Sequence, residues 1–390
     1  MKILITCHSY YPRKDGVQFV TQYLAEGLAK KGHKVTVYTI YHPEDTKLLE
    51  EIHTDVKIKR IIAYTKHTIH HGEKEKYIQS IIEESKKNDI MINVCTQCAT
   101  TDWILDSLDK IKIPKILYLH SIWNFKYNAE DFTSIRNLIS KIWCNIRWKI
   151  YYKTNKCNFK KYDLVTQLHN MDYSYKFFKV KYDIDCEIVE NAAENDFFKT
   201  SLDNTIELPQ NYILNVSNYL KRKNQEKLLK LFFESEISDK WELILIGSHR
   251  NAYYDKLEKI YDKYRQKGGL KKVRLLYNIP REDIPTYVKK AKIYLMTSKW
   301  EAFPISLVES IAAGVPFISS NVGIVKYLPG GVVCNKDEEY KFWLNEFCLN
   351  ENVRICYGKL GSSIAKDKYS IESKVNKVES FLKQILENKK

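Results

Sequence analysis

Short apolar runs alternate along the chain with longer segments in which apolar residues recur every three or four positions. Residues 3–5, 35–40, 91–94 and 116–119 are runs of the first kind, and their continuous hydrophobicity predicts strands buried on both faces. Residues 17–29 carry apolar side chains at helical spacing. This order of strand, helix and strand predicts a parallel sheet covered by helices.

The same alternation restarts in the second half of the chain. Residues 212–216, 241–246 and 273–279 predict strands, and a helical pattern follows the first of them. The polar residues 199–211, which include Pro209, predict a linker between the two halves. Because 390 residues exceed one ordinary core, the sequence predicts two α/β domains.

The segment 293–323 contains the most informative pattern. Apolar runs at 293–296 and 317–320 predict strands, and the residues between them predict a loop followed by a short helix. Ser306 stands three residues before Glu309, the spacing of a capping box, so we expect the helix to begin at Ser306. The free N–H groups of such a helix start favour an anion, and the loop leads directly to them.

Two carboxylates flank this predicted anion site. Glu301 lies in the loop and Glu309 in the first helical turn. Taken singly, Glu301 is typical of a solvated loop acid, and Glu309 is equally well explained as a capping partner. Together with the helix start they suit a phosphate-bearing sugar, because the sugar hydroxyls need carboxylates and the phosphate needs N–H donors.

Glu301 and Glu309, with the Phe-Pro pair at 303–304 and Gly-Val-Pro at 314–316, resemble the E-x7-E signature of retaining glycosyltransferases of family 4. The segment departs from that family at Ala302, where glycine is usual, and we expect a stiffer loop rather than lost function. The resemblance implies the GT-B architecture, an α/β fold of two Rossmann-like domains facing across a cleft.

The resemblance also implies roles around a sugar donor. Glu301 would hold hydroxyls of the donor sugar and Glu309 those of the ribose, while the helix start would stabilise the leaving diphosphate. Lys223 matches the phosphate-contacting lysine of the family, and Arg222 would replace the arginine that is usual where Asn218 stands. The full donor-binding set implied is Gly16, Asn218, Arg222, Lys223, Phe303, Pro304, Ile305, Ser306 and Glu309.

A histidine completes the expected catalytic set. His120 follows the strand predicted at 116–119, and a lone histidine at such a place is more often structural. The segment Tyr-Leu-His-Ser around it resembles the family segment that brings a histidine to the donor sugar. The resemblance therefore implies Glu301, His120 and Lys223 as catalytic residues.

No metal and no resident cofactor is expected. His67, His70 and His71 lack carboxylate or cysteine partners at ligand spacing. Cys95 and Cys98 have no second pair at zinc spacing, and two thiols near a buried strand end explain them. We expect metal-independent transfer, because cationic side chains can replace a metal at a diphosphate.

The resemblance implies a division of labour between the domains. We expect residues 1–205 to form an N-terminal acceptor domain and residues 206–371 to form a C-terminal domain that binds the nucleotide sugar. The last segment, 372–390, has apolar residues at helical spacing, and family members commonly return such a helix to the first domain.

The positive net charge of the chain favours binding to phosphate-rich partners. The formal net charge is +15, and the basic excess is spread over both halves of the chain. Residues 141–161 hold seven Lys or Arg and no acid, interleaved with aromatic residues. This composition is typical of a helix on an anionic membrane, of a nucleic-acid contact, or of a helix that packs its aromatic side chains inward.

The location expected from sequence is the cytoplasm. The first apolar run is too short for a signal peptide, and no stretch is long enough to span a membrane. Nine scattered cysteines suit a reducing compartment. With the basic segment 141–161, we expect a protein that is peripheral on the inner face of the cell membrane.

The resemblance implies a retaining hexosyltransferase that uses a UDP- or GDP-sugar and a glycan or lipid-linked glycan acceptor, in cell-surface polysaccharide synthesis. One alternative is a GT-B nucleotide-sugar epimerase or phosphorylase-like enzyme. Another is a basic protein that binds nucleic acid or a membrane surface on an inactive GT-B frame. The intact pair of Glu301 and Glu309 argues against that last class, so no nucleic-acid partner is expected.

Overall fold

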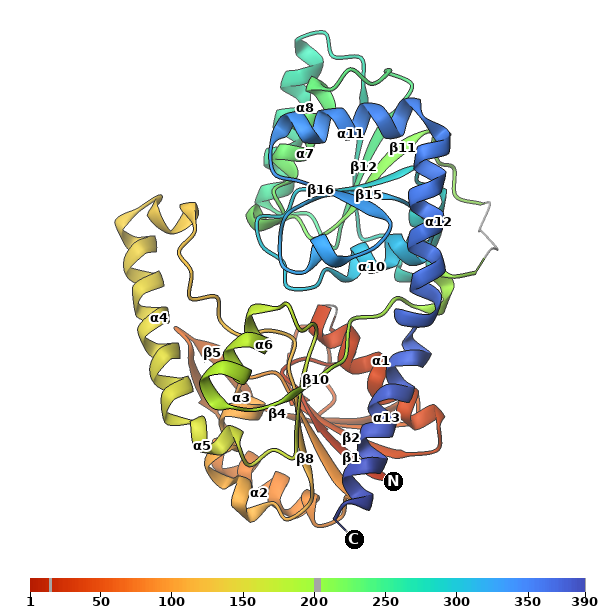
Figure 1. The fold of residues 1–390 in the computed structure, drawn as a ribbon. Coiled ribbons are helices and arrows are strands. Elements are labelled where there is room, and N and C mark those ends of the chain that lie inside the picture. Colours follow the sequence, from red (N-terminus) through yellow and green to blue (C-terminus); the bar gives the residue numbers. More distant parts are fainter. Residues whose placement is uncertain (14–15, 200–204, 390) are drawn as a thin grey trace. The chain divides into compact units, whose positions relative to one another are not determined.

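The computed structural model describes residues 1–13, 16–199 and 205–389. The chain divides into two compact units. The first comprises residues 1–190 and 374–390, and the second comprises residues 191–373. Each unit has a sheet of mainly parallel strands with helices packed around it, as the α/β prediction required (Figure 1).

The first unit is built on a sheet with the strand order β10-β9-β8-β7-β1-β2-β4-β3. Every pair is parallel except β3 with β4 at one edge. The order reverses between β1 and β7, whose side chains are buried almost throughout. The strands are β1 (Lys2–Thr6), β2 (Lys34–Ile40), β3 (Glu50–His53), β4 (Val56–Ile61), β7 (Ile90–Val94), β8 (Lys115–Tyr118), β9 (Leu164–Gln167) and β10 (Cys186–Ile188).

The helices of the first unit cover this sheet with apolar side chains. The core between them is rich in buried aromatic residues, among them Tyr77, Tyr152, Phe159 and Phe178. Burial of such large side chains is the main source of stability here. The helices are α1 (Gly16–Lys30), α2 (Lys74–Ser85), α3 (Ala99–Asp102), α4 (Ile135–Thr154), α5 (Lys156–Phe159), α6 (Tyr173–Phe177) and α13 (Ile371–Glu387).

A small hairpin carries His70 and His71, in a segment for which we predicted no strand from the sequence. Strands β5 (Ala63–Lys66) and β6 (Ile69–Gly72) pair antiparallel. His70 of this hairpin contacts Asp102 of α3 at 3.0 Å, and Arg147 of α4 donates two hydrogen bonds to the Thr68 carbonyl. These tertiary contacts hold the hairpin in place. The sequence did not predict it, because strands of four residues carry too little periodicity to be recognised.

The second unit contains a sheet in the order β13-β12-β11-β14-β15-β16, with every neighbouring pair parallel. Counted within the unit this is 3-2-1-4-5-6, the order of doubly wound nucleotide-binding folds. The strands are β11 (Tyr212–Val216), β12 (Glu242–Gly247), β13 (Lys272–Tyr277), β14 (Ile293–Met296), β15 (Phe317–Ser320) and β16 (Gly331–Cys334). The helices are α7 (Gln225–Glu234), α8 (Ala252–Gln266), α9 (Ile284–Lys290), α10 (Ile305–Ala312), α11 (Asp337–Leu349) and α12 (Glu351–Lys368).

The second unit begins earlier than the boundary at 205/206 that we placed from the sequence. The Asn191 side-chain amide donates to the Phe303 carbonyl at 2.8 Å. Ala193 N–H donates to the Tyr369 carbonyl at 2.9 Å. These contacts assign the stretch after residue 190 to the second unit, although its sequence gave no strand or helix signal. Part of the linker expected at 199–211, residues 200–204, lies outside the described residues.

From Lys374 onward, the helix α13 belongs to the first unit and lies beside α1 in Figure 1. Its Lys374 ammonium is buried and pairs with Glu190 at 2.8 Å. A Cβ on Gly27 of α1 would approach a methyl of Val375 to 2.5 Å, so glycine permits the close packing of the two helices. The chain thus enters and leaves the second unit next to one buried ion pair.

Candidate functional site

The loops that carry the predicted donor residues leave two adjacent strands of the second unit. β11 and β14 are neighbours, and the strand order reverses between them. In open α/β sheets, ligands bind beyond the carboxyl ends of strands at such a reversal. Arg222 and Lys223 follow β11, whereas Glu301 and the start of α10 follow β14. The sheet therefore brings these two loops to one edge.

The loop after β11 is a rigid support for two cations. Residues Lys221–Lys223 form a single 3₁₀ turn, and Asn224 follows in the left-handed conformation with φ of 57°. The buried Gln225 side chain donates to the carbonyls of Ser217 and Asn218. The Asn218 carbonyl thus accepts a hydrogen bond within the loop, while Asn218 itself is exposed.

Glu301 and Lys223 form an ion pair in this structure. The Lys223 ammonium lies 2.6 Å from one carboxylate oxygen of Glu301, and the Arg222 guanidinium lies 3.7 Å from the other. Glu301 is buried, and Arg222 is substantially exposed. A carboxylate and two cations are therefore gathered within one small volume, where a group with hydroxyls and a phosphate could contact both signs of charge.

Backbone contacts fix the loop that carries Glu301. Gly323 has φ of 53°, and a Cβ there would come within 2.3 Å of the Ala302 carbonyl oxygen. Ile324 N–H donates to the same carbonyl at 3.3 Å. Ala302 itself is not among the described non-glycine residues with positive φ, so alanine is tolerated where the family usually has glycine.

The capping box expected at the start of α10 is not formed. α10 begins at Ile305 with Pro304 as its N-cap, and no side chain caps it. Ser306 instead lies beside the buried Tyr294 hydroxyl and opposes the rise in the pKa of Tyr294 that burial causes. That hydroxyl hydrogen-bonds both backbone groups of Val216 at the end of β11. Tyr294 of β14 thus connects the neighbourhood of the helix start to the end of β11.

Glu309 has a different partner, which the sequence analysis did not identify. It is 2% exposed, and its carboxylate pairs with the guanidinium of Arg281. Arg281 also pairs with Glu194 at 2.8 Å and stacks 5.3 Å from the ring centre of Phe197. The three charged side chains form a row, Glu194–Arg281–Glu309.

The charges in this row shift one another's ionisation. Burial raises the pKa of Glu194, and the negative charge of Glu309 adds to that rise, although Arg281 opposes it. Burial disfavours the charged form of Arg281, yet the two carboxylates more than compensate and hold the pKa of Arg281 above its usual value. Arg281 is therefore a permanent cation that can fix the Glu309 carboxylate.

The other donor residues predicted from the sequence lie around these charges or in the first unit. Phe303 is buried, with its carbonyl held by Asn191. Gly16 is the first residue of α1, after β1 in the first unit. His120 follows β8 and is buried, with its ring 5.4 Å from that of Tyr118. Whether Gly16 and His120 join the donor site stays a prediction, because both belong to the first unit.

Metal ligation has limited support among the described residues. His70 is engaged by Asp102 and Thr65, and His71 stacks on Tyr64, so these histidines do not converge on one point. All nine cysteines are free thiols. His42, Glu44 and Asp45 form a different group of possible ligands, with donor atoms within 4.8 Å of one another. Arg13 already hydrogen-bonds the carboxylates of both Glu44 and Asp45.

Two mainly parallel α/β units of this topology in one chain define the GT-B fold. Residues 196–329, within the second unit, match the family described as "Glycosyl transferases group 1". That region carries Lys223, Glu301 and Glu309. The fold is also that of the sucrose-phosphate synthase of Thermosynechococcus elongatus, with a TM-score of 0.74 at 14% identity over 99% of both chains.

Two curated relatives match shorter stretches. The O-antigen chain mannosyltransferase B of Escherichia coli is 30% identical over 115 residues, 29% of each chain. The UDP-Gal:alpha-D-GlcNAc-diphosphoundecaprenol alpha-1,3-galactosyltransferase of Escherichia coli is 27% identical over 135 residues, 32% of this chain and 34% of that protein. The matches thus span about a third of the length of these relatives.

Proposed function

We propose that the protein is a retaining glycosyltransferase that takes a sugar from a nucleotide diphosphate donor. The observation that carries this proposal is the meeting of Lys223, Arg222 and Glu301 beside the start of α10, at the strand-order reversal of the second unit. A sugar diphosphate presents hydroxyls next to phosphates, and this volume offers a carboxylate next to cations and N–H groups.

The chemistry of transfer assigns a role to each group. As the bond from the anomeric carbon to the diphosphate breaks, negative charge develops on the leaving phosphate. Lys223, Arg222 and the first N–H groups of α10 stabilise that charge in a preorganised site. Glu301 holds donor-sugar hydroxyls, and Glu309, fixed by Arg281, accepts the ribose hydroxyls. With these cations at the diphosphate, we expect transfer without a metal ion.

We extend the proposal to the substrates and the location. The donor is a UDP- or GDP-sugar, bound by the second unit, and the acceptor is a glycan or lipid-linked glycan, bound by the first. The name of one relative, a transferase that uses UDP-Gal and a diphosphoundecaprenol acceptor, supports this direction. We also propose work in cell-surface polysaccharide synthesis, at the cytoplasmic face of a membrane, with His120 and Gly16 contributing from the first unit.

Thermal unfolding in the presence of UDP, GDP, ADP or CMP tests the donor site. One nucleoside diphosphate should raise the melting temperature of the natural protein, because a ligand bound only to the folded state stabilises it. Glu309→Ala should lose that shift. Glu234→Ala, which removes a surface carboxylate paired with Lys341, should keep it. If no nucleotide shifts the natural protein, or if both variants respond alike, the proposal is wrong.

A further inference from the structure

The helix α4 of the first unit has one face that packs inward and one that meets solvent. Lys141, Asn145, Trp148 and Tyr152 are its buried residues. They recur at three and four positions, which places them on one side of the helix. Even the polar members are satisfied there, since Asn145 bonds the Trp123 indole and Lys141 donates to the Asn124 carbonyl at 2.6 Å.

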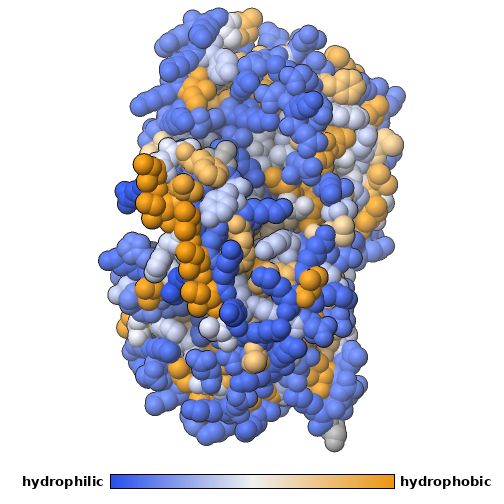
Figure 2. All heavy atoms as spheres, turned by 60° about the vertical axis from the view of Figure 1, so that its left-hand side comes forward, coloured by the Kyte–Doolittle hydropathy of each residue, from blue (hydrophilic) through white to orange (hydrophobic). Residues whose placement is uncertain are grey.

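The opposite face of α4 is a stripe of large apolar side chains. Its members recur at positions i, i+4, i+7, i+8, i+11 and i+15, which aligns them along about four turns. Figure 2 shows hydrophobic side chains gathered in a band on the face of the first unit that carries this helix. The stripe, with exposed fractions, consists of Ile135 (79%), Ile139 (61%), Ile142 (40%), Trp143 (54%), Ile146 (51%) and Ile150 (57%).

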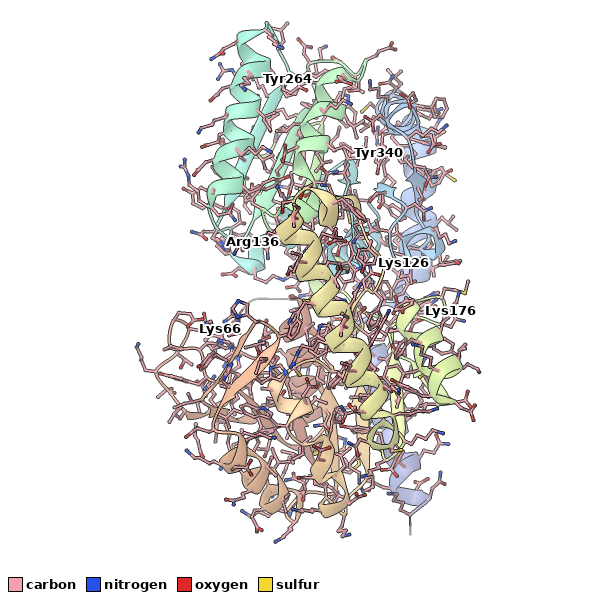
Figure 3. All side chains as sticks on the ribbon, turned by 90° about the vertical axis from the view of Figure 1, so that its left-hand side faces the viewer. Lys66, Lys126, Arg136, Lys176, Tyr264 and Tyr340 are labelled. Atoms are coloured by element: carbon pink, nitrogen blue, oxygen red, sulfur yellow. The ribbon has the colours of Figure 1, made fainter. Side chains whose placement is uncertain are left out.

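Cations flank this stripe. At about 100° per residue, Arg136 and Arg147 project on one side of it and Lys149 on the other, with Lys153 at its C-terminal end. Figure 3 looks onto α4 and labels Arg136 in its first turn. Within the described residues, neither Arg136 nor the two lysines form an ion pair. The sequence contains no Asp or Glu from residue 132 to residue 162.

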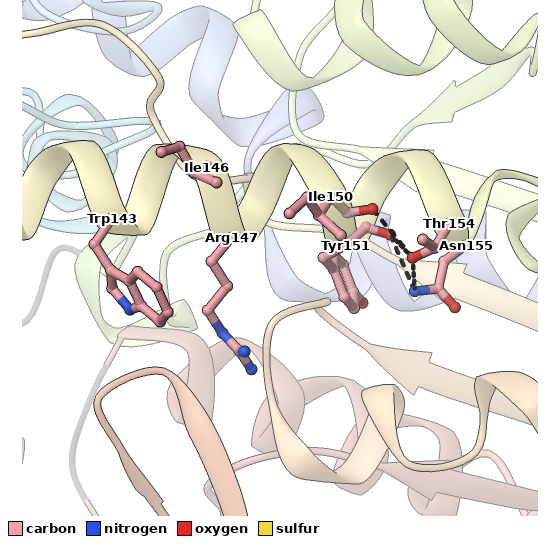
Figure 4. Close-up of a pocket in the computed structure, with 7 residues that line it drawn as sticks. All are labelled: Trp143, Ile146, Arg147, Ile150, Tyr151, Thr154 and Asn155. Atoms are coloured by element: carbon pink, nitrogen blue, oxygen red, sulfur yellow. Dashed lines mark hydrogen bonds between the residues drawn. The ribbon is translucent and has the colours of Figure 1, made fainter.

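A shallow hollow of about 320 Å³ adjoins the stripe (Figure 4). Trp143 and Arg147 leave the helix on the same side of it, and Ile146 and Ile150 contribute apolar wall. The Arg147 guanidinium is fixed there, because it donates to the Thr68 carbonyl at 2.7 and 3.0 Å. The exposed apolar surface therefore continues from the stripe into this hollow, which the Arg147 guanidinium borders.

This geometry relocates the surface that the sequence suggested. The basic, aromatic segment 141–161 contributes less than its composition implied, since Trp148, Tyr152 and Phe159 are in the core. On α4 the exposed large apolar residues begin earlier, at Ile135, and end at Ile150. A sequence of alternating basic and aromatic residues could not show this, because burial depends on what the helix packs against.

The geometry points to residues 135–153 as the surface that docks on an anionic lipid bilayer, with the isoleucines and Trp143 in the interface and the flanking cations at the headgroups. A second copy of the chain fits less well, because a symmetric contact would bring two sets of unneutralised cations together. This inference deepens the proposed function by naming the membrane-contacting face, and it rests on observations outside the donor site.

Vesicle binding by the full-length protein tests the inference. The protein should cosediment with vesicles of phosphatidylglycerol and phosphatidylcholine, and far less with phosphatidylcholine alone. The variant Ile139→Glu with Ile146→Glu should lose this binding at least tenfold. Its matched control is Ile355→Glu with Leu360→Glu, two exposed apolar residues of α12 in the second unit, which should bind as the natural protein does. Equal binding by the two double variants would overturn the inference.

Two further readouts separate charge, insertion and self-association. Arg136→Gln with Lys149→Gln and Lys153→Gln should weaken binding and reduce its salt dependence. Tryptophan fluorescence should shift to the blue on anionic vesicles, and Trp143→Phe should abolish that shift. If sedimentation without lipid instead shows a dimer that Ile139→Glu breaks, and vesicles do not bind, the face serves a second copy and the inference is wrong.

The donor-site experiment keeps the two proposals apart. The nucleotide-induced rise in melting temperature should be the same in the stripe variants and the natural protein, because the stripe contains none of the proposed donor residues. Loss of vesicle binding with an intact nucleotide response therefore concerns the stripe alone. Vesicle binding without any nucleotide response would leave the stripe supported and the proposed function wrong.

Discussion

Glu301 and Glu309 belong to one short motif, yet the structure places them in two different electrostatic settings. Glu301 lies in a loop and pairs with Lys223, which follows the neighbouring strand β11. Glu309 lies inside α10 and pairs with Arg281, which lies in the short turn before α9. Both carboxylates are buried, and each receives its cation from a segment distant in sequence.

The two settings differ in the charged side chain that lies near each ion pair. Lys223 has Arg222 beside it, so the pair with Glu301 is part of a cluster with excess positive charge. Arg281 has Glu194 on its other side, so the pair with Glu309 is part of a row with excess negative charge. The first setting suits a diphosphate and the second suits hydroxyl donors, which is how one motif can hold two parts of a donor.

The largest effect should come from removing the cation of the first setting. Lys223→Ala leaves the developing charge of the leaving diphosphate with less stabilisation, and we expect kcat/KM to fall by about 10²–10³. Lys223→Arg should recover part of that loss, since it restores the charge. Steady-state transfer from the nucleotide sugar identified by the thermal experiment measures both. Unchanged kcat/KM in Lys223→Ala would mean that the ion pair with Glu301 is only structural.

The second setting should respond more weakly to loss of its cation. Arg281→Gln leaves Glu309 without a fixed orientation, and we expect nucleotide affinity to fall about tenfold, equivalent to about 1.4 kcal/mol. Arg281→Lys should retain part of it. The control is Arg274→Gln, which removes a surface pair with Glu242 and should leave nucleotide affinity unchanged. Isothermal titration with the free nucleotide measures all three variants, and equal affinities would refute the positioning role.

Backbone support of the Glu301 loop can be tested through Gly323. Gly323→Ala places a Cβ against the Ala302 carbonyl in a left-handed conformation, so we expect destabilisation of about 1–3 kcal/mol and reduced activity. Gly268→Ala is the matched control, because Gly268 has φ of 85° and a Cβ added there would meet nothing within 4 Å. Melting temperatures should fall further for Gly323→Ala. Equal falls would show that strain alone, rather than loop contact, matters.

The smallest effect concerns pH and the second setting. The pKa of Glu194 is raised above its ordinary 4.5, so in the range just above that value the folded state binds a proton that the unfolded state has released. The contribution of Glu194 to stability therefore falls as pH rises through this range. Glu194→Gln should remove that fall, seen as a flatter dependence of melting temperature on pH. An unchanged slope would contradict the raised pKa.

Much of this organisation was determined by the sequence. Continuous apolar runs predicted the central strands of both sheets, because parallel strands are covered on two faces and need no polar alternation. The segment 293–323 predicted the strand, loop and helix that carry the two carboxylates, since Gly314 can take the left-handed conformation that ends a helix and Pro316 cannot continue one. Lys223 was predicted from the resemblance of its loop to the family's phosphate-contacting loop; the structure places it beside Glu301, and its role at the donor stays a prediction.

Tertiary structure decided the partners. Nothing in the sequence near Arg281 shows that it pairs with both Glu194 and Glu309, because the packed fold, not the spacing along the chain, brings these segments together. The same holds for Ser306, which lies beside Tyr294 and does not cap its helix. On α4, composition indicated a basic aromatic surface, but packing buried Trp148 and exposed the isoleucines. Local patterns specify elements, and only the packed fold specifies which faces and charges meet.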